Sequence, residues 1–125
     1  MHKRFEVRRL AGVPIEVISA KSDLPFDFVS FDMSPRGAFL MSDAEPRLGE
    51  QIVCSFSLDG AAKPFCFFAE VSRVNRGRRV SDFAPRGFGV RFLDPTAFER
   101  LTIRSCLRSQ PPMYLSLRKP VRAAP

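Results

Sequence analysis

Hydrophobic residues recur at every second position along two stretches of this chain. From Ile52 to Leu58 and from Phe65 to Val71, the positions of one parity are apolar throughout. A period of two is typical of β-strands that bury one face. Between the two stretches, residues 59–64 (Asp-Gly-Ala-Ala-Lys-Pro) have a turn composition. The pattern therefore predicts two antiparallel strands joined as a hairpin.

Four further short runs have strand character and are bounded by turn residues. They span Val13–Ile18, Phe26–Met33, Ala38–Met41 and Phe88–Leu93. Six short strands separated by turns are typical of an all-β fold, and closure into a barrel removes the exposed edges that an open sheet would leave. We therefore expect a six-stranded antiparallel β-barrel, closed or partly closed.

A single α-helix is predicted after the last strand. Asp94 is placed to cap the first amides, and Pro95 suits the first helical position, where no amide hydrogen is needed. Four apolar residues then fall roughly on one face: Phe98, Leu101, Ile103 and Leu107. The pattern ends near Ser109, before two consecutive prolines, so the helix should plug or flank the barrel.

These elements divide the chain into three parts. We expect a basic, flexible lead-in over residues 1–12, the barrel and its helix over 13–109, and a proline-rich basic tail, expected to be mobile, over 110–125. A chain of 125 residues is long enough for one domain whose core needs no disulfide or metal. A second, catalytic domain does not fit.

The charge of the chain points to a polyanionic partner. Against 13 Asp and Glu stand 20 Lys and Arg, a net charge of +7 that is concentrated at the two chain ends and in the 70s. Such a balance favours a phosphate ligand, nucleic acid or an anionic membrane surface. No apolar run approaches the roughly 20 residues of a membrane helix, and no signal-like stretch opens the chain. We expect a cytoplasmic protein that does not insert into membranes.

The cysteines and the histidine argue against an enzyme. Cys54, Cys66 and Cys106 are odd in number and form no CxxC pair, which favours buried, reduced thiols over disulfides or a zinc site. His2 is the only histidine and lies near the chain end, which weakens any mechanism with a histidine base. We therefore predict no catalytic activity, metal or cofactor.

The segment from Asp32 to Gly37 carries the most specific chemistry. It places an acid, a hydroxyl and a glycine at fixed spacing on a strand-turn-strand. Asp32 can accept hydrogen bonds from the N–H groups of a base, Ser34 can donate to a phosphate or orient Asp32, and Gly37 permits a positive φ or close backbone approach. An ordinary β-turn recruits the same residue types, so composition alone leaves both interpretations open.

Arginines cluster just before the first predicted strand, at Arg4, Arg8 and Arg9. A planar guanidinium can bind phosphate through two N–H groups, contact the O6 and N7 atoms of guanine, and stack on a purine. The cluster therefore suits a guanine nucleotide. The alternative is a basic terminus that is simply solvated.

Together these features resemble the PilZ domain, a bacterial receptor module for the second messenger cyclic di-GMP. The RxxxR spacing at Arg4 and Arg8 is followed by the DxSxxG pattern of Asp32, Ser34 and Gly37. The strands at residues 38–40 and 87–92 are also similar, so the resemblance covers about residues 4–108.

The resemblance implies a six-stranded PilZ-like barrel with a C-terminal helix and a cyclic di-GMP site on its surface. Carried onto this sequence, the ligand residues are Arg4, Arg8, Asp32, Ser34 and Gly37, with Arg9 and Arg36 as further candidates. In the family, the two arginines clasp phosphates and guanines, the aspartate accepts hydrogen bonds from a guanine, and the serine and glycine form the turn and contact phosphate.

Three classes of function follow from these observations. In the first, cyclic di-GMP orders the arginine lead-in against the barrel and so changes a surface that binds a protein partner, not identified by the sequence. In the second, a degenerate PilZ-like adaptor binds no nucleotide and acts through protein contacts in motility or surface behaviour. Gly12 favours the adaptor, because family members often read Arg-Val-Pro where this chain has Gly12 before Val13 and Pro14.

A third class, general nucleic-acid binding, is suggested by the net charge and by Arg76, Arg78 and Arg79 on one turn. It lacks a stacking platform, because most phenylalanines occupy alternating positions that should face the core. We therefore predict no specific nucleic-acid partner.

Overall fold

The computed structural model describes residues 7–19, 21, 25–77 and 85–110. Its strands are β1 (Arg9–Leu10), β2 (Pro14–Ser19), β3 (Phe26–Ser34), β4 (Gly37–Met41), β5 (Gln51–Phe56), β6 (Phe65–Asn75) and β7 (Gly87–Phe92), and its helix is α1 (Ala97–Leu107). Arg4, Arg78, Arg79 and the expected tail after residue 110 lie outside the described residues.

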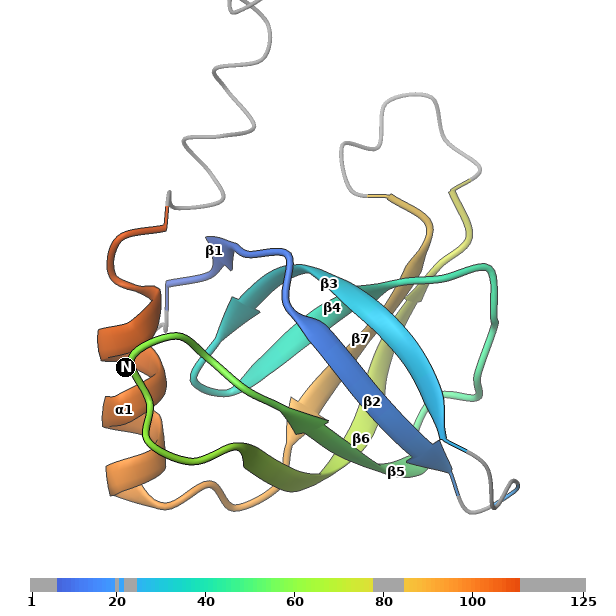
Figure 1. The fold of residues 1–125 in the computed structure, drawn as a ribbon. Helices are drawn as coiled ribbons and strands as arrows, with labels where there is room; N and C mark the ends of the chain where they lie inside the picture. Colours follow the sequence, from blue (N-terminus) through green and yellow to red (C-terminus); the bar gives the residue numbers. More distant parts are fainter. Residues whose placement is uncertain (1–6, 20, 22–24, 78–84, 111–125) are drawn as a thin grey trace, which may run out of the picture.

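Six strands, β2 to β7, close into an antiparallel barrel, and β1 is added beside β3 (Figure 1). Neighbouring strands follow the order β1-β3-β2-β5-β6-β7-β4, and a further pairing of β3 with β4 closes the ring. The predicted six-stranded antiparallel barrel with one C-terminal helix is therefore confirmed.

The extra strand β1 lies on the same side of β3 as β2. Arg9 pairs with Met33 and Leu10 pairs with Asp32, whereas β2 pairs with the earlier half of β3. Residues 9 and 10 belong to the lead-in that we expect to be flexible, yet they form a strand. The reason is that β2 covers only part of β3, and the backbone groups beyond it need hydrogen-bond partners.

The inward face of the barrel is a stack of apolar side chains. The alternation in the two stretches that predicted a hairpin matches β5 and β6, which pair from Gln51 with Glu70 to Phe56 with Phe65. Phe56, Phe67 and Phe92 lie with ring centroids between 4.7 and 6.1 Å apart. Aromatic rings packed in this way contribute large apolar area to the core.

The helix α1 stands at one end of the barrel (Figure 1) and begins later than the sequence predicts. Thr96, not Asp94, is the N-cap: its hydroxyl accepts a hydrogen bond from the Glu99 amide at 3.1 Å, and the Glu99 carboxylate accepts one from the Thr96 amide at 2.8 Å. This reciprocal capping box satisfies two helix amides. Asp94 instead turns the chain with a φ of 51° before the helix begins.

The helix buries fewer apolar residues than expected. Ile103 and Leu107, four residues apart on one stripe, are buried, whereas Phe98 and Leu101 are exposed. At about 100° per residue, Leu101 points about 160° away from Ile103 and Phe98 about 140° away from it, so neither can share the buried stripe. The prediction of one common apolar face was wrong for these two residues.

The three cysteines carry no disulfide, but they are not all buried. Cys54 is buried, Cys106 is half-buried and Cys66 is exposed. The prediction of a buried thiol was wrong for Cys66, because β6 alternates and its inward positions on either side are taken by Phe65 and Phe67. Burial raises the pKa of the Cys54 thiol to about 12.

Candidate functional site

A tight turn between β3 and β4 positions the acid, the hydroxyl and the glycine of the candidate motif. Ser34 pairs with Gly37 across the turn. The Ser34 hydroxyl, which is buried, accepts a hydrogen bond from the Arg36 amide at 3.2 Å. Pro35 and Arg36 form the loop itself, and Arg36 is exposed. The motif thus forms its own turn, and Asp32 lies two residues before Ser34, where the turn begins.

A β-bulge in β3 turns Asp32 to the outer face of the barrel. Ser30 pairs with Leu40 and Asp32 pairs with Phe39, so Phe31 is an extra residue in β3. A bulge of this kind re-aims the side chains that follow it. Leu40 belongs to the cluster of core side chains, so its partner Ser30 lies on the inner face. Phe39 does not belong to that cluster, so its partner Asp32 lies on the outer face. Without the extra residue, the two side chains would share one face.

Arg8 is the arginine that the fold brings to Asp32. The Arg8 Nε donates to Asp32 Oδ1 at 2.9 Å, and Arg8 Nη2 makes a second contact with the same oxygen. The Arg8 side chain is 36% exposed, but that of Asp32 is 1% exposed. The arginine therefore covers the carboxylate from the solvent side and supplies the charge-assisted hydrogen bonds that a buried carboxylate needs.

The other carboxylate oxygen of Asp32 has no partner. Asp32 Oδ2 is buried and accepts no hydrogen bond, and among the described residues no other buried side-chain oxygen or nitrogen is in this state. Most buried polar atoms in proteins are hydrogen-bonded, so an exception calls for an explanation. A ligand that brings N–H groups to this oxygen would satisfy it.

Ser30 stabilises the chain beside this part of β3, and the sequence did not identify it as a functional residue. Its hydroxyl accepts a hydrogen bond from the Val13 amide at 2.9 Å and donates one to the Ala11 carbonyl. The chain between β1 and β2 is therefore fastened around one fully buried serine. The only signal in the sequence is a small hydroxyl residue between two apolar neighbours, Val29 and Phe31, which is too common to single it out.

Gly37 is required by close packing. An added Cβ would overlap the carbonyl oxygen of Val90, on the neighbouring strand β7. Its φ is not positive; the glycines with positive φ are Gly49, Gly60 and Gly77. Of the two roles that the sequence left open for Gly37, the structure therefore supports close backbone approach.

The remaining candidate arginines are not gathered around Asp32 in the same way. Arg4 lies outside the described residues. The Arg9 Nη1 donates to the carbonyl oxygen of Gln110, just beyond α1, at 3.0 Å. Gly12 is exposed, and a Cβ there would make only an ordinary contact with Val29 at 3.8 Å. Position 12 thus has room for a side chain, but it is Arg8 that reaches Asp32.

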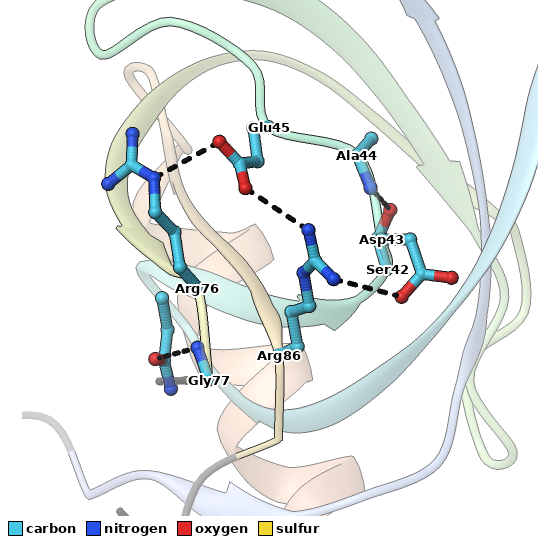
Figure 2. A network of polar contacts seen from close by, with 8 residues as sticks. Ser42, Asp43, Ala44, Glu45, Arg76, Gly77 and Arg86 are labelled. Carbon is cyan, nitrogen blue, oxygen red and sulfur yellow. Dashed lines mark hydrogen bonds and ion pairs between the residues drawn. The ribbon is translucent and has the colours of Figure 1, made fainter. Parts of the chain in front are cut away.

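A second charged cluster connects the loop after β4 to the residues just after β6 and just before β7 (Figure 2). One oxygen of Glu45 accepts from Arg76 Nε at 3.0 Å, and the other accepts from Arg86 Nη2 at 3.1 Å. Arg86 also lies 3.9 Å from Asp43. The hydrogen bond from Arg76 is the largest of the contacts that hold the pKa of Glu45 below its usual value. These exposed ion pairs position the loop.

The described residues offer neither a metal site nor a membrane helix. No group of three or more His, Cys, Asp or Glu side chains is placed to hold a metal ion within this part of the chain. No helix there has the length and apolar character that crossing a bilayer requires. A pocket of about 350 Å³ lies between the end of α1 and residues 11–14, but Asp32 and Arg8 do not line it.

Comparison with known proteins identifies related sequences and folds. A model of the PilZ domain family matches residues 2–109 of the chain. No curated protein sequence matches the chain significantly.

Solved structures of low sequence identity share the fold. The PilZ domain of CeSA from a cellulose-synthesizing bacterium is 24% identical and has a TM-score of 0.54, over 79% of this chain and 93% of that one. The PilZ domain of YcgR from Escherichia coli, solved with c-di-GMP, is 18% identical and has a TM-score of 0.60, over 97% of this chain and 99% of that one. The inhibitor of motility MotI from Bacillus subtilis is 15% identical and has a TM-score of 0.65, over 95% of this chain and 53% of its own length. This chain therefore spans about half of MotI.

Proposed function

The chain belongs to the PilZ domain family, and on that premise we propose that it is a receptor for cyclic di-GMP. One observation carries the proposal: Asp32 is a buried carboxylate with one oxygen bound by Arg8 and the other without a partner. The similar PilZ domain of YcgR, which was solved with c-di-GMP, supports the choice of ligand.

Guanine has the hydrogen-bond donors that this carboxylate lacks. Its ring N–H and its amino group lie side by side and can both point at one carboxylate, whereas adenine presents an acceptor next to its amino group. An unsatisfied buried acceptor costs about 1–3 kcal/mol. A guanine that satisfies Asp32 Oδ2 recovers this cost, which an adenine cannot do to the same extent. We therefore expect a preference for cyclic di-GMP over cyclic di-AMP.

Arg8 has two roles in this proposal. Without ligand, it covers Asp32 and neutralises the carboxylate. When guanine takes its place at the carboxylate, the guanidinium becomes available to a ligand phosphate, where two parallel N–H groups fit well. Arg4, Arg9 and Arg36 are further candidates for the phosphates, and Ser34 and Gly37 shape the turn against which the ligand lies.

The arginine segment that contacts Asp32 also connects ligand binding to the end of the helix α1. Arg8 is followed directly by β1, and Arg9 donates to the Gln110 carbonyl beyond α1. A ligand that draws the arginines onto the barrel competes with this hydrogen bond and changes the surface at the end of the helix. We propose that a protein partner, whose identity is open, recognises the changed surface.

An adaptor that binds no nucleotide is the second candidate, and an apolar band on the outer face of the barrel favours it. Ile18, Val53 and Phe68 pair with one another across β2, β5 and β6. Phe68 is 70% exposed. Exposed aromatic surface of this kind is common in protein interfaces. In this second proposal, the chain acts through that surface alone.

Isothermal titration calorimetry with cyclic di-GMP separates the two candidates. We expect the wild-type chain to bind, and Arg8→Ala and Asp32→Ala each to weaken binding by one to two decades, the value of a charged hydrogen-bond pair of about 1.5–3 kcal/mol. Cyclic di-AMP should bind more weakly than cyclic di-GMP. Absence of heat at high micromolar ligand would instead support the adaptor.

A charge-matched control excludes general attraction between a basic protein and an anion. Lys63 is exposed in the turn between β5 and β6, and Lys63→Ala removes one positive charge as Arg8→Ala does. We expect the Lys63 variant to bind like the wild type. Equal losses in the two variants, with a steep dependence on salt, would favour nonspecific polyanion binding.

A further inference from the structure

Outward-facing positions on four neighbouring strands form a row around the barrel that starts at Asp32 and ends at Arg73. Asp32 on β3 pairs with Phe39 on β4, Phe39 pairs with Gly89 on β7, and Gly89 pairs with Arg73 on β6. Neighbouring strands lie about 4.8 Å apart, so the backbone path across these four strands is about 14 Å long. The Arg73 side chain extends back along it to the Phe39 ring, whose strand neighbours that of Asp32.

A second bulge points the side chain of Arg73 outward. In the pairing of β6 with β7, Val71 pairs with Val90 and Arg73 pairs with Gly89, so Ser72 is an extra residue. The Ser72 hydroxyl closes the bulge by donating to the Gly89 carbonyl at 3.3 Å. Since Val71 belongs to the core, a regular strand would turn Arg73 inward as well. Bulges therefore mark both ends of the row.

In the middle of the row, β7 carries glycines on its outer face, and the aromatic ring of Phe39 lies beside them. An added Cβ at Gly87 would come within 3.0 Å of the Phe39 ring, and one at Gly89 would lie 3.7 Å from Arg73 Nε. A side chain at Gly87 would also overlap the Leu40 carbonyl oxygen, whereas one at Gly89 would make only ordinary contacts. Phe39 is buried, but it does not belong to the cluster of side chains that pack together inside the barrel.

Arg73 covers that ring and remains exposed. Its guanidinium carbon lies over the Phe39 ring, 5.2 Å from the centroid. Arg73 as a whole residue is exposed to solvent. A guanidinium held over an aromatic ring is pre-organised, because its position is set before any ligand arrives, and a guanidinium can also stack on a purine.

We propose that Arg73 is a further ligand-binding residue of this site and that a purine base of the bound dinucleotide stacks on its outer face. This inference rests on the proposed function. One guanine lies at Asp32 and the other extends along the row, so that the second base forms a layer with Arg73 and Phe39. Base stacking of this kind changes affinity by roughly one to two orders of magnitude per base.

The competing explanation is that Arg73 only shields Phe39 from water. Two substitutions distinguish the explanations. Arg73→Met keeps a long apolar chain over the ring but removes the planar cation, and Arg73→Lys keeps the charge but cannot stack. If Arg73 only shields the ring, both variants should bind cyclic di-GMP as the wild type does.

The experiment measures cyclic di-GMP affinity by calorimetry and ligand-free stability by thermal unfolding. We expect Arg73→Met and Arg73→Lys each to weaken binding about tenfold, with unfolding temperatures near that of the wild type. Lys63→Met is the control, because Lys63 lies beyond the far end of β6. It should change neither quantity.

The outcomes separate this inference from the proposed function. If the wild-type chain does not bind cyclic di-GMP, the proposed function fails and the role of Arg73 fails with it. If the wild type binds and Arg73→Met binds equally well, only the role of Arg73 is wrong. If Arg73→Lys retains wild-type affinity while Arg73→Met loses it, Arg73 acts through its charge, which contradicts the stacking.

Discussion

Removal of Arg8 should destabilise the ligand-free protein more than neutralisation of Asp32. The two side chains form one ion pair, but only Asp32 is buried: its side chain is 1% exposed against 36% for Arg8. Arg8→Ala leaves a buried carboxylate with no hydrogen bond at either oxygen. Asp32→Asn leaves a guanidinium that water can reach. The two changes break the same contact with different consequences.

The structure sets the size of each effect. Two donors of Arg8 contact one oxygen of Asp32, and hydrogen bonds to charged groups are worth about 1.5–3 kcal/mol. Water partly replaces the lost arginine, so we expect Arg8→Ala to lower the free energy of unfolding by about 1.5–2 kcal/mol. Asn at position 32 keeps the shape and one acceptor oxygen, so a loss of about 0.5–1 kcal/mol is expected.

Urea unfolding followed by far-ultraviolet circular dichroism measures these values, since the chain has no Trp and one Tyr. The wild type, both single variants and the double variant form a cycle, and we expect the double variant to lose about 1 kcal/mol less than the sum of the singles. Arg9→Ala is the matched control, because the hydrogen bond from Arg9 to Gln110 is exposed. It should cost less than about 0.5 kcal/mol.

Two results would refute this reasoning. If Asp32→Asn destabilises the protein more than Arg8→Ala does, the carboxylate is not the buried member of the pair. If the effects of the two single variants simply add, the side chains do not interact in solution. Either result would also remove the basis for placing a guanine at Asp32.

Three further predictions concern other parts of the barrel. Gly37→Ala should lower the free energy of unfolding by about 1–3 kcal/mol in the same urea assay, because its Cβ would overlap the Val90 carbonyl; wild-type stability would contradict the close approach. A thiol reagent at pH 8 should label the exposed Cys66 in the native state and leave the buried Cys54, whose pKa is about 12, unmodified until the protein unfolds; mass spectrometry of peptides would show the reverse order if the outward register of β6 were wrong. Glu45 has a lowered pKa in the folded state, so its contribution to stability is present above its ordinary value of 4.5 and is lost as the pH falls through the folded value. The loss of stability on acidification should therefore be smaller in Glu45→Gln, and identical pH profiles would show that its ion pairs do not form in solution.

Local patterns in the sequence determined most of the fold. Period-two alternation identified β5 and β6 because one face of each strand is buried, so every second residue has to be apolar. Turn residues located the corner between β3 and β4 in the same way. The motif residues were visible because acid, hydroxyl and glycine lie within six positions of one another.

Tertiary structure decided which side chains meet. Arg8 and Asp32 are brought together by the pairing of β1 with β3, and the alternation of residues says nothing about partners so distant in the chain. The outward direction of Asp32 and Arg73 depends on one extra residue in each strand, at Phe31 and Ser72. A bulge can be recognised only from the pairing of two strands, not from the residues of one strand. The surface that faces the ligand therefore follows from register, which a single strand does not encode.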